Sequence, residues 1–157
     1  MNWRSPLIER APRNFELIML LEKIPENFNP TEVVGCCVYC NGEVLLLLRQ
    51  DHKSAGNKWG EPAGKVEKGE DKFDAIVREL FEETGISKNI NELKFRGTYF
   101  FTGPNGDLTY HSFIIKLDKK PEIKINNAEH KKFLWATIEE ALKLDLVYDL
   151  DFLISDL

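Results

Sequence analysis

Two apolar runs near residue 40 predict a β-hairpin. Residues 32–40 and 43–49 are rich in valine, leucine and cysteine, which is typical of strands. The runs are joined by Asn41 and Gly42, a pair that tolerates the positive φ angles of a tight two-residue turn. We therefore expect two antiparallel strands joined by this turn, followed by a polar loop over residues 50–58.

A helical period follows over residues 71–84. Apolar side chains recur there every three or four positions, as on one face of an amphipathic helix. Gly85 comes directly after this stretch, and a glycine in that place typically ends a helix. The apolar face predicted for this helix consists of Phe73, Ile76, Val77, Leu80 and Phe81.

The second half of the chain again predicts strands. Residues 93–101 and 108–117 are β-rich, and a Gly-Pro-Asn-Gly sequence at 103–106 predicts a turn between them. Residues 132–135 predict a further short strand. The stretch 59–62 ends in a proline and is expected to be irregular.

Two short helices are expected near the end of the chain. Thr137 can cap a helix that runs to about Lys143, and Glu140 stands where it completes a capping box. Residues 149–157 predict one or two further helical turns. The order of strands and helices predicts one domain, either α+β or an α/β/α sandwich.

The first 30 residues look like an addition to this domain. A helix is expected over about residues 14–23, and Pro25 breaks the chain after it. We therefore expect residues 1–30 to be an N-terminal extension that packs on a domain of residues 31–157.

Composition and charge narrow the class of function. The chain has 157 residues, 43% of them hydrophobic and 30% charged, which is typical of one soluble globular domain. Without a long apolar run or a signal-peptide pattern, the expected location is the cytoplasm, with no membrane partner. The net charge of −5 argues against a long nucleic acid as partner, but not against a small phosphorylated ligand. A homodimer stays open.

Three cysteines cluster in the first predicted strand, at Cys36, Cys37 and Cys40. Cys37 and Cys40 have the C-x-x-C spacing of some metal sites. A zinc site needs about four ligands, however, and the sequence offers no second pair of cysteines or histidines at a matching spacing. We therefore interpret the cysteines as small apolar side chains of a buried strand.

The predicted central helix carries Glu79, Glu82 and Glu83 at i, i+3 and i+4. At this spacing they fall within an arc of about 100°, away from the apolar face. Like charges one turn apart repel, and a divalent cation, which prefers oxygen ligands, removes that repulsion. Gly64 and Lys65 precede the helix in a loop where a glycine lets the main chain approach a ligand. These residues predict a cradle for phosphate and metal.

This arrangement resembles the Nudix box, the signature of the Nudix hydrolase family. The box reads glycine, five residues, glutamate, seven residues, Arg-Glu, an aliphatic residue, any residue, Glu-Glu, any residue, glycine and an aliphatic residue. The resemblance covers about residues 31–145 and does not explain the first 30. Every fixed position of the box is matched, by Gly64, Glu70, Arg78, Glu79, Leu80, Glu82, Glu83, Gly85 and Ile86.

The resemblance implies an α/β/α sandwich around a mixed sheet. The box would form a loop–helix–loop that holds Mg²⁺ or Mn²⁺. Glu82 and Glu83 are the implied metal ligands, and Glu79 is a further ligand or a base. The main-chain carbonyl of Ala63, just before the box glycine, is also an implied ligand.

Two further residues receive roles from the resemblance. Arg78 would orient the glutamates by ion pairing, with Glu70 as a structural member of the same network. Family members often carry another carboxylate on a late loop, a few residues before a tryptophan-containing strand. Glu129 stands six residues before Trp135 and is therefore a candidate metal ligand and base; the alternative is a solvated loop glutamate.

Cationic and aromatic side chains complete the candidates. Arg49 and Lys65 would bind the phosphates, although a surface role for Arg49 is an equal alternative. The single histidines His52, His111 and His130 have no spaced partners, so we expect no metal or nucleophilic role for them. Aromatic residues that could stack on a base are Tyr99, Phe100, Phe101 and Tyr110, each of which has core packing as its alternative.

The implied function is metal-dependent hydrolysis of the diphosphate linkage in a nucleoside diphosphate joined to another group. Two substrate classes compete: nucleotide sugars such as ADP-ribose, which residues 62–64 suggest, and nucleoside triphosphates, which the small size favours. Capped or dinucleoside polyphosphates stay open. The alternative class is a catalytically inactive Nudix-like domain that senses nucleotides or binds a partner, and the intact Glu82–Glu83 pair argues against it.

Overall fold

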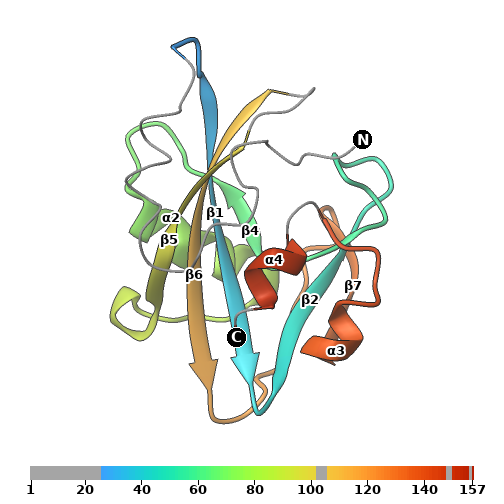
Figure 1. The fold of residues 1–157 in the computed structure, drawn as a ribbon. Coiled ribbons are helices and arrows are strands. Elements are labelled where there is room, and N and C mark those ends of the chain that lie inside the picture. The colour runs from blue at the N-terminus through green and yellow to red at the C-terminus, as the bar shows by residue number, and fades with distance from the viewer. Residues whose placement is uncertain (1–25, 102–105, 148–149, 156) are drawn as a thin grey trace.

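The computed structural model describes residues 26–101, 106–147, 150–155 and 157, which build one β-sheet with helices on both faces (Figure 1). The helix expected at 14–23, and most of the turn expected at 103–106, lie outside the described residues. In chain order the elements are β1 (Pro30–Cys40), β2 (Glu43–Arg49), β3 (Trp59–Gly60), β4 (Ala63–Lys65), α2 (Lys72–Thr84), the 3-10 helix η2 (Ile90–Glu92), β5 (Lys94–Phe101), β6 (Asp107–Leu117), β7 (His130–Thr137), α3 (Ile138–Ala141) and α4 (Leu150–Ile154).

A parallel pair of long strands forms the centre of the sheet. β1 runs parallel to β6 from the pairing of Pro30 with Asp107 to that of Cys40 with Leu117. The other strand pairs are antiparallel; the order is β3-β2-β1-β6-β5, with β4 paired to β1 and β7 paired to β2. The sheet is therefore mixed, as the resemblance implied.

Two hydrophobic layers lie on opposite faces of this sheet. Successive side chains of a strand point to opposite faces, so Cys36 packs in the layer against α2, and Cys37 packs in the layer against α3 and α4. The first layer includes Val34, Val38, Leu45, Leu47, Ile76, Leu80, Phe113 and Ile115. The second includes Val44, Leu46, Ile114, Ala136, Ala141, Leu150, Leu153 and Ile154. The predicted α/β/α sandwich is thus confirmed.

The predicted hairpin is present between β1 and β2. Asn41 and Gly42 have φ angles of 49° and 87°, the positive values that this turn requires. Beyond the hairpin, long-range pairing changes three predictions. Residues 59–60, expected to be irregular, form β3 against β2, and residues 63–65, expected in a loop, form β4 against β1. Strand β7 is longer than the predicted 132–135, because its pairing with β2 runs from Thr137 to His130 with one irregularity at Leu48/Arg49.

Helix α2 begins and ends as predicted but buries a different arc. Asp71 caps its N-terminus by accepting a hydrogen bond of 2.8 Å from the main-chain N–H of Phe73, and Gly85 ends it with φ 75°. The predicted apolar face was partly wrong, because Phe81 is 57% exposed. The buried residues are Ala75, Ile76, Leu80, Glu83 and Thr84. The buried arc therefore carries one of the box glutamates into the interior.

The end of the chain agrees with its predicted caps. Thr137 and Glu140 form the expected capping box, although α3 ends at Ala141 rather than near Lys143. A last helix, α4, lies within the predicted stretch 149–157. None of the helices in the described residues is long and apolar enough to cross a membrane.

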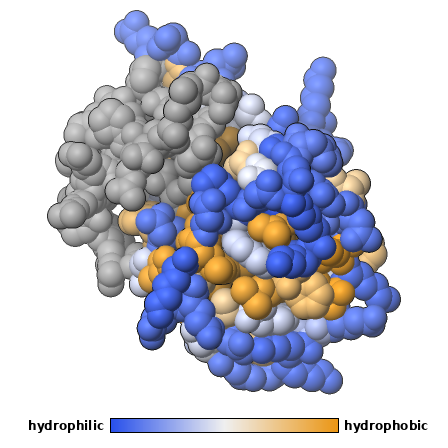
Figure 2. All heavy atoms as spheres, turned by 90° about the vertical axis from the view of Figure 1, so that its right-hand side faces the viewer, coloured by the Kyte–Doolittle hydropathy of each residue, from blue (hydrophilic) through white to orange (hydrophobic). Residues whose placement is uncertain are grey.

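Strand β7 forms one edge of the sheet. Among the described strands it pairs only with β2, and its apolar residues Phe133 and Leu134 are exposed. Figure 2 shows this side of the molecule, where apolar groups are surrounded by polar ones. The exposed Lys131 and Lys132 precede the apolar pair along the strand, as charged residues do on edges that avoid pairing with another chain.

All three cysteines are buried and none forms a disulfide. Cys37 and Cys40 are three positions apart on β1 and therefore belong to opposite faces of the sheet. This placement is incompatible with one shared metal ion and agrees with the interpretation as apolar core side chains. Burial raises the pKa of the Cys36 and Cys37 thiols, which keeps them protonated.

Replacing Cys36, Cys37 and Cys40 together with alanine should lower stability far more than activity. Each lost sulfur leaves unfilled core volume, and we expect about 1 kcal/mol for each site. Urea unfolding followed by circular dichroism measures the loss. Stoichiometric zinc in the purified parent protein that disappears in the triple variant would contradict the core interpretation.

Candidate active site

The loop before α2 lies against the first glutamate of the box helix. β4 pairs Gly64 with β1, and a methyl group added at Gly64 would overlap the carboxylate of Glu79. Any larger residue at position 64 must therefore displace Glu79 or move the loop. The sequence predicted that glycine here lets the main chain approach a ligand; in the structure the group that approaches it is the carboxylate of Glu79.

Arg78 joins the helix to this loop through its guanidinium group. Its Nε and Nη2 donate to the two carboxylate oxygens of Glu70, both at 2.8 Å, and Nη2 also donates to the carbonyl of Lys65 at 3.0 Å. Its Nη1 donates to Glu79 at 2.7 Å and to Glu82 at 3.3 Å. The predicted ion-pair network of Arg78, Glu70 and the glutamates is thus present.

The pKa values of two carboxylates in this network shift in opposite directions. The hydrogen bonds from Arg78 lower the pKa of Glu70 to about 2. Glu79 is more buried, and burial raises its pKa despite the contact with Arg78; the charges of Glu83 and Glu82 raise it further. Burial thus destabilises the negative charge of Glu79, which suits a carboxylate that accepts a proton or faces a cation.

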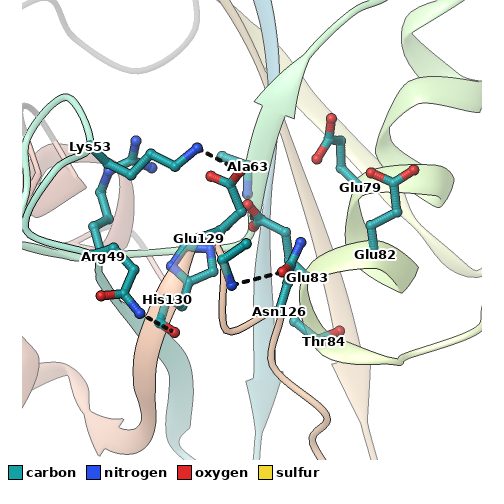
Figure 3. Close-up of polar contacts among 12 residues, drawn as sticks. Arg49, Lys53, Ala63, Glu79, Glu82, Glu83, Thr84, Asn126, Glu129 and His130 are labelled. Atoms are coloured by element: carbon teal, nitrogen blue, oxygen red, sulfur yellow. Dashed lines mark hydrogen bonds and ion pairs between the residues drawn. The ribbon is translucent and has the colours of Figure 1, made fainter.

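Glu83 lies inside the protein and links the helix to the sheet. Its Oε2 accepts a hydrogen bond of 2.9 Å from the main-chain N–H of Ala63. Its Oε1 lies 3.0 Å from Nε2 of His130, at the start of β7, without the geometry of a hydrogen bond (Figure 3). Both ring nitrogens of His130 are buried, and neither has a hydrogen-bond partner among the described residues. We expected no metal or nucleophilic role for this histidine, and it contacts a predicted metal ligand.

Glu129 and Lys53 form the opposite side of the site from α2 (Figure 3). Nζ of Lys53 is 2.6 Å from Oε1 of Glu129, and this contact lowers the pKa of the carboxyl. Glu129 is adjacent in sequence to His130, so the fold brings the predicted late carboxylate towards Glu83. The sequence did not single out Lys53, because it lies in a polar loop with no motif of its own.

The two predicted phosphate-binding residues, Arg49 and Lys65, lie at the ends of different strands. Arg49 ends β2, and its Nε donates to the carbonyl of Ser54 at 2.7 Å. Figure 3 shows Arg49 on the same side of the site as Lys53. Lys65 is exposed at the end of β4, where its main-chain carbonyl, rather than its ammonium group, contacts Arg78.

The donor chemistry of the site fits a hard divalent cation. Glu79, Glu82 and Glu83 supply carboxylate oxygens, which Mg²⁺ and Mn²⁺ prefer, and the mutual repulsion of these charges would be relieved by a cation. In the part of the chain that is described, no three acidic, histidine or cysteine side chains converge closely enough to hold a metal in common. Each candidate carboxylate instead contacts a group of the protein through at least one oxygen, so a metal would share or replace these contacts.

A buried acid next to the site was not predicted from the sequence. Glu61 precedes Pro62, and its Oε1 accepts a hydrogen bond of 2.5 Å from the hydroxyl of Tyr110. Burial raises the pKa of Glu61 to about 7. Its Oε2 and Nη1 of Arg96 are both buried and have no hydrogen-bond partner within the part of the chain that the structure describes. Tyr110, a candidate for base stacking, is thus engaged with Glu61; Tyr99, another candidate, packs edge-on against Phe152.

Comparison with known proteins finds a family model that matches most of the chain. The model of the NUDIX domain matches residues 29–155. A Caenorhabditis elegans protein named asymmetrical bis(5'-nucleosyl)-tetraphosphatase is 29% identical over 106 residues, 66% of this chain and 75% of that protein. The CTP pyrophosphohydrolase of Escherichia coli is 27% identical over 117 residues, 73% of this chain and 82% of that enzyme.

A solved structure also resembles this fold. It is a bifunctional NMN adenylyltransferase/ADP ribose pyrophosphatase from Francisella tularensis, complexed with AMP and a manganese ion. The TM-score is 0.67 at 25% identity, and the match covers 90% of this chain and 44% of that one. The similarity therefore extends over nearly the whole of this chain and about half of the larger protein.

The Arg78–Glu70 contact should make stability depend on pH. Because the folded pKa of Glu70 lies below its ordinary value of 4.5, the ionised carboxylate stabilises the fold at neutral pH, and this contribution is lost as the pH falls towards about 2. Glu70→Gln should cost about 1–3 kcal/mol at pH 7. The difference in melting temperature from the parent should shrink between pH 5 and 3, and a constant difference would contradict the assignment. Glu139→Gln, on exposed α3, is the control.

Gly64→Ala should impair the site by displacing the Glu79 carboxylate. A displacement of about 1 Å can cost about 10²-fold in rate, and we expect a loss of that order. Steady-state kinetics of Gly64→Ala, Glu79→Gln and the double variant measure it. If the effect runs through Glu79, the two losses should not add; fully additive losses would refute this route.

Proposed function

Because the chain belongs to the NUDIX family, whose model matches residues 29–155, we propose that it is a metal-dependent pyrophosphohydrolase acting on a nucleotide derivative. The bond cleaved would be the diphosphate linkage of a nucleoside diphosphate joined to another group. NUDIX hydrolases generally use divalent metal ions, and the Francisella tularensis relative contains manganese. For this chain the proposed cofactor is Mg²⁺ or Mn²⁺.

The observation that carries the proposal is the approach of Gly64 to Glu79, with Arg78 holding the carboxylate. The loop and the helix thereby present carboxylates and main chain to one place. Glu79, Glu82, Glu83, Glu129 and the carbonyl of Ala63 are the proposed metal ligands. When bound, the metal would neutralise phosphate charge and lower the pKa of an attacking water.

The protein's own groups would position substrate and move the proton. Glu79 is the first candidate for the base, because burial and its acidic neighbours raise its pKa. Glu129 is the second candidate, although Lys53 lowers its pKa. Arg49 and Lys65 are proposed to bind phosphate oxygens, where positive charge stabilises the negative charge of the transition state.

Nucleotide sugars and nucleoside triphosphates are the two main substrate candidates, and dinucleoside polyphosphates are a third. The named relatives include one of each class: one is named for ADP ribose, one for CTP and one for a dinucleoside tetraphosphate. A panel of ADP-ribose, CTP, ATP and diadenosine tetraphosphate, assayed with Mg²⁺ and with Mn²⁺, discriminates them. The alternative, a nucleotide-sensing or partner-binding domain without activity, would bind a panel member without metal-dependent release of product.

Glu83→Gln should abolish most activity while the fold persists. Glu83 is buried, but glutamine has the same size and shape and keeps a hydrogen-bond acceptor. The amide oxygen of glutamine can still accept the hydrogen bond from Ala63, whereas the negative charge that would hold the metal is lost. We expect kcat to fall by about 10²-fold or more. Parental kcat for Glu83→Gln on the best panel substrate would refute the site; Glu139→Gln should be silent.

A further inference from the structure

Lys53 places an ammonium group at the rim of the proposed site. It contacts Glu129 on the side of the site opposite α2 (Figure 3). The two side chains are 30% and 34% exposed, so the pair lies at the rim and can be reached from solvent. Lys53 thus adds a positive charge to a region where α2 contributes three glutamates.

The main chain on both sides of this ion pair is fixed. The N–H of Gln50 donates to the carbonyl of Glu129 at 2.9 Å, and its side-chain amide donates to the carbonyl of Asn127 at 2.8 Å. Lys131 pairs with Asp51 in the same region. The loop that carries Lys53 and the turn that carries Glu129 are therefore one unit. Only the flexible lysine side chain has to move for the ion pair to open.

The ion pair and a bound metal would compete for the same carboxylate. If Glu129 holds a divalent cation, the ammonium group of Lys53 is repelled by that cation and loses its partner. Substrate phosphates would bring negative charge to the same rim. A partly exposed ion pair is weak enough to be exchanged for such a ligand.

We propose that Lys53 is a substrate-binding residue that contacts Glu129 in the free protein and phosphate oxygens of the nucleotide in the metal-bound complex. The inference rests on the proposed function, because it takes Glu129 as a metal ligand. It assigns a second role to the ion pair: in the absence of metal it neutralises Glu129, and in the complex the released lysine holds the diphosphate.

Lys53→Met tests the proposal by its opposite effects on two ligands. Mn²⁺ alone, titrated by electron paramagnetic resonance, should bind about two- to fivefold more tightly, because the competing ammonium group is gone. The non-hydrolysable α,β-methylene-ADP, titrated by calorimetry at saturating Mn²⁺, should bind about 10-fold more weakly or worse. Lys143→Met is the matched control, because Lys143 forms a similar 2.8 Å ion pair with Glu139 away from the site.

Glu129→Gln isolates the exchange from other effects of Lys53. In this background Lys53→Met should no longer tighten Mn²⁺ binding, yet it should still weaken α,β-methylene-ADP. Weaker binding of both ligands with a lower melting temperature would overturn the proposal in favour of a structural ion pair, and unchanged nucleotide binding would overturn it outright. Neither titration needs turnover, so a protein that shows both effects but hydrolyses nothing would refute the proposed hydrolysis and leave the role of Lys53 standing.

Discussion

The guanidinium group of Arg78 is the contact on which the candidate site depends. It binds Glu70 with two hydrogen bonds and still reaches Glu79 and Glu82, so one positive charge serves three carboxylates. Without it, the glutamates of α2 would repel one another, and the loop would lose its link to the helix through the carbonyl of Lys65. The same group thus stabilises the fold and sets the charge of the site.

The other half of the site comes from the sheet. The antiparallel pairing of β7 with β2 places His130 at the start of β7, where it meets Glu83. Gln50, just after β2, then joins the turn that holds Glu129. The strand pairing therefore brings Glu129 and His130, which lie far from α2 in the sequence, close to the glutamates of that helix.

Local chemistry explains what could be predicted from the sequence. The turn at Asn41-Gly42, the cap at Gly85 and the box itself depend on residues close in the chain, and each has the predicted form or contacts. The roles of Lys53 and Glu61 could not be predicted, because each contacts a residue far away in the sequence. Glu129 lies 76 positions after Lys53, and Tyr110 lies 49 positions after Glu61. Phe81 was misplaced because helical period alone does not show which arc meets the sheet and which meets the loop.

The reactivity of the buried thiols can report local unfolding of the two hydrophobic layers. Cys36 and Cys37 are neighbours on β1 but face different hydrophobic layers, and both resist ionisation. Since thiol-directed alkylation needs an accessible thiolate, modification can proceed only when the layer covering that sulfur separates from the sheet. Mass-spectrometric labelling of the two positions would therefore show whether the layers separate together or one before the other, with no probe added to the chain.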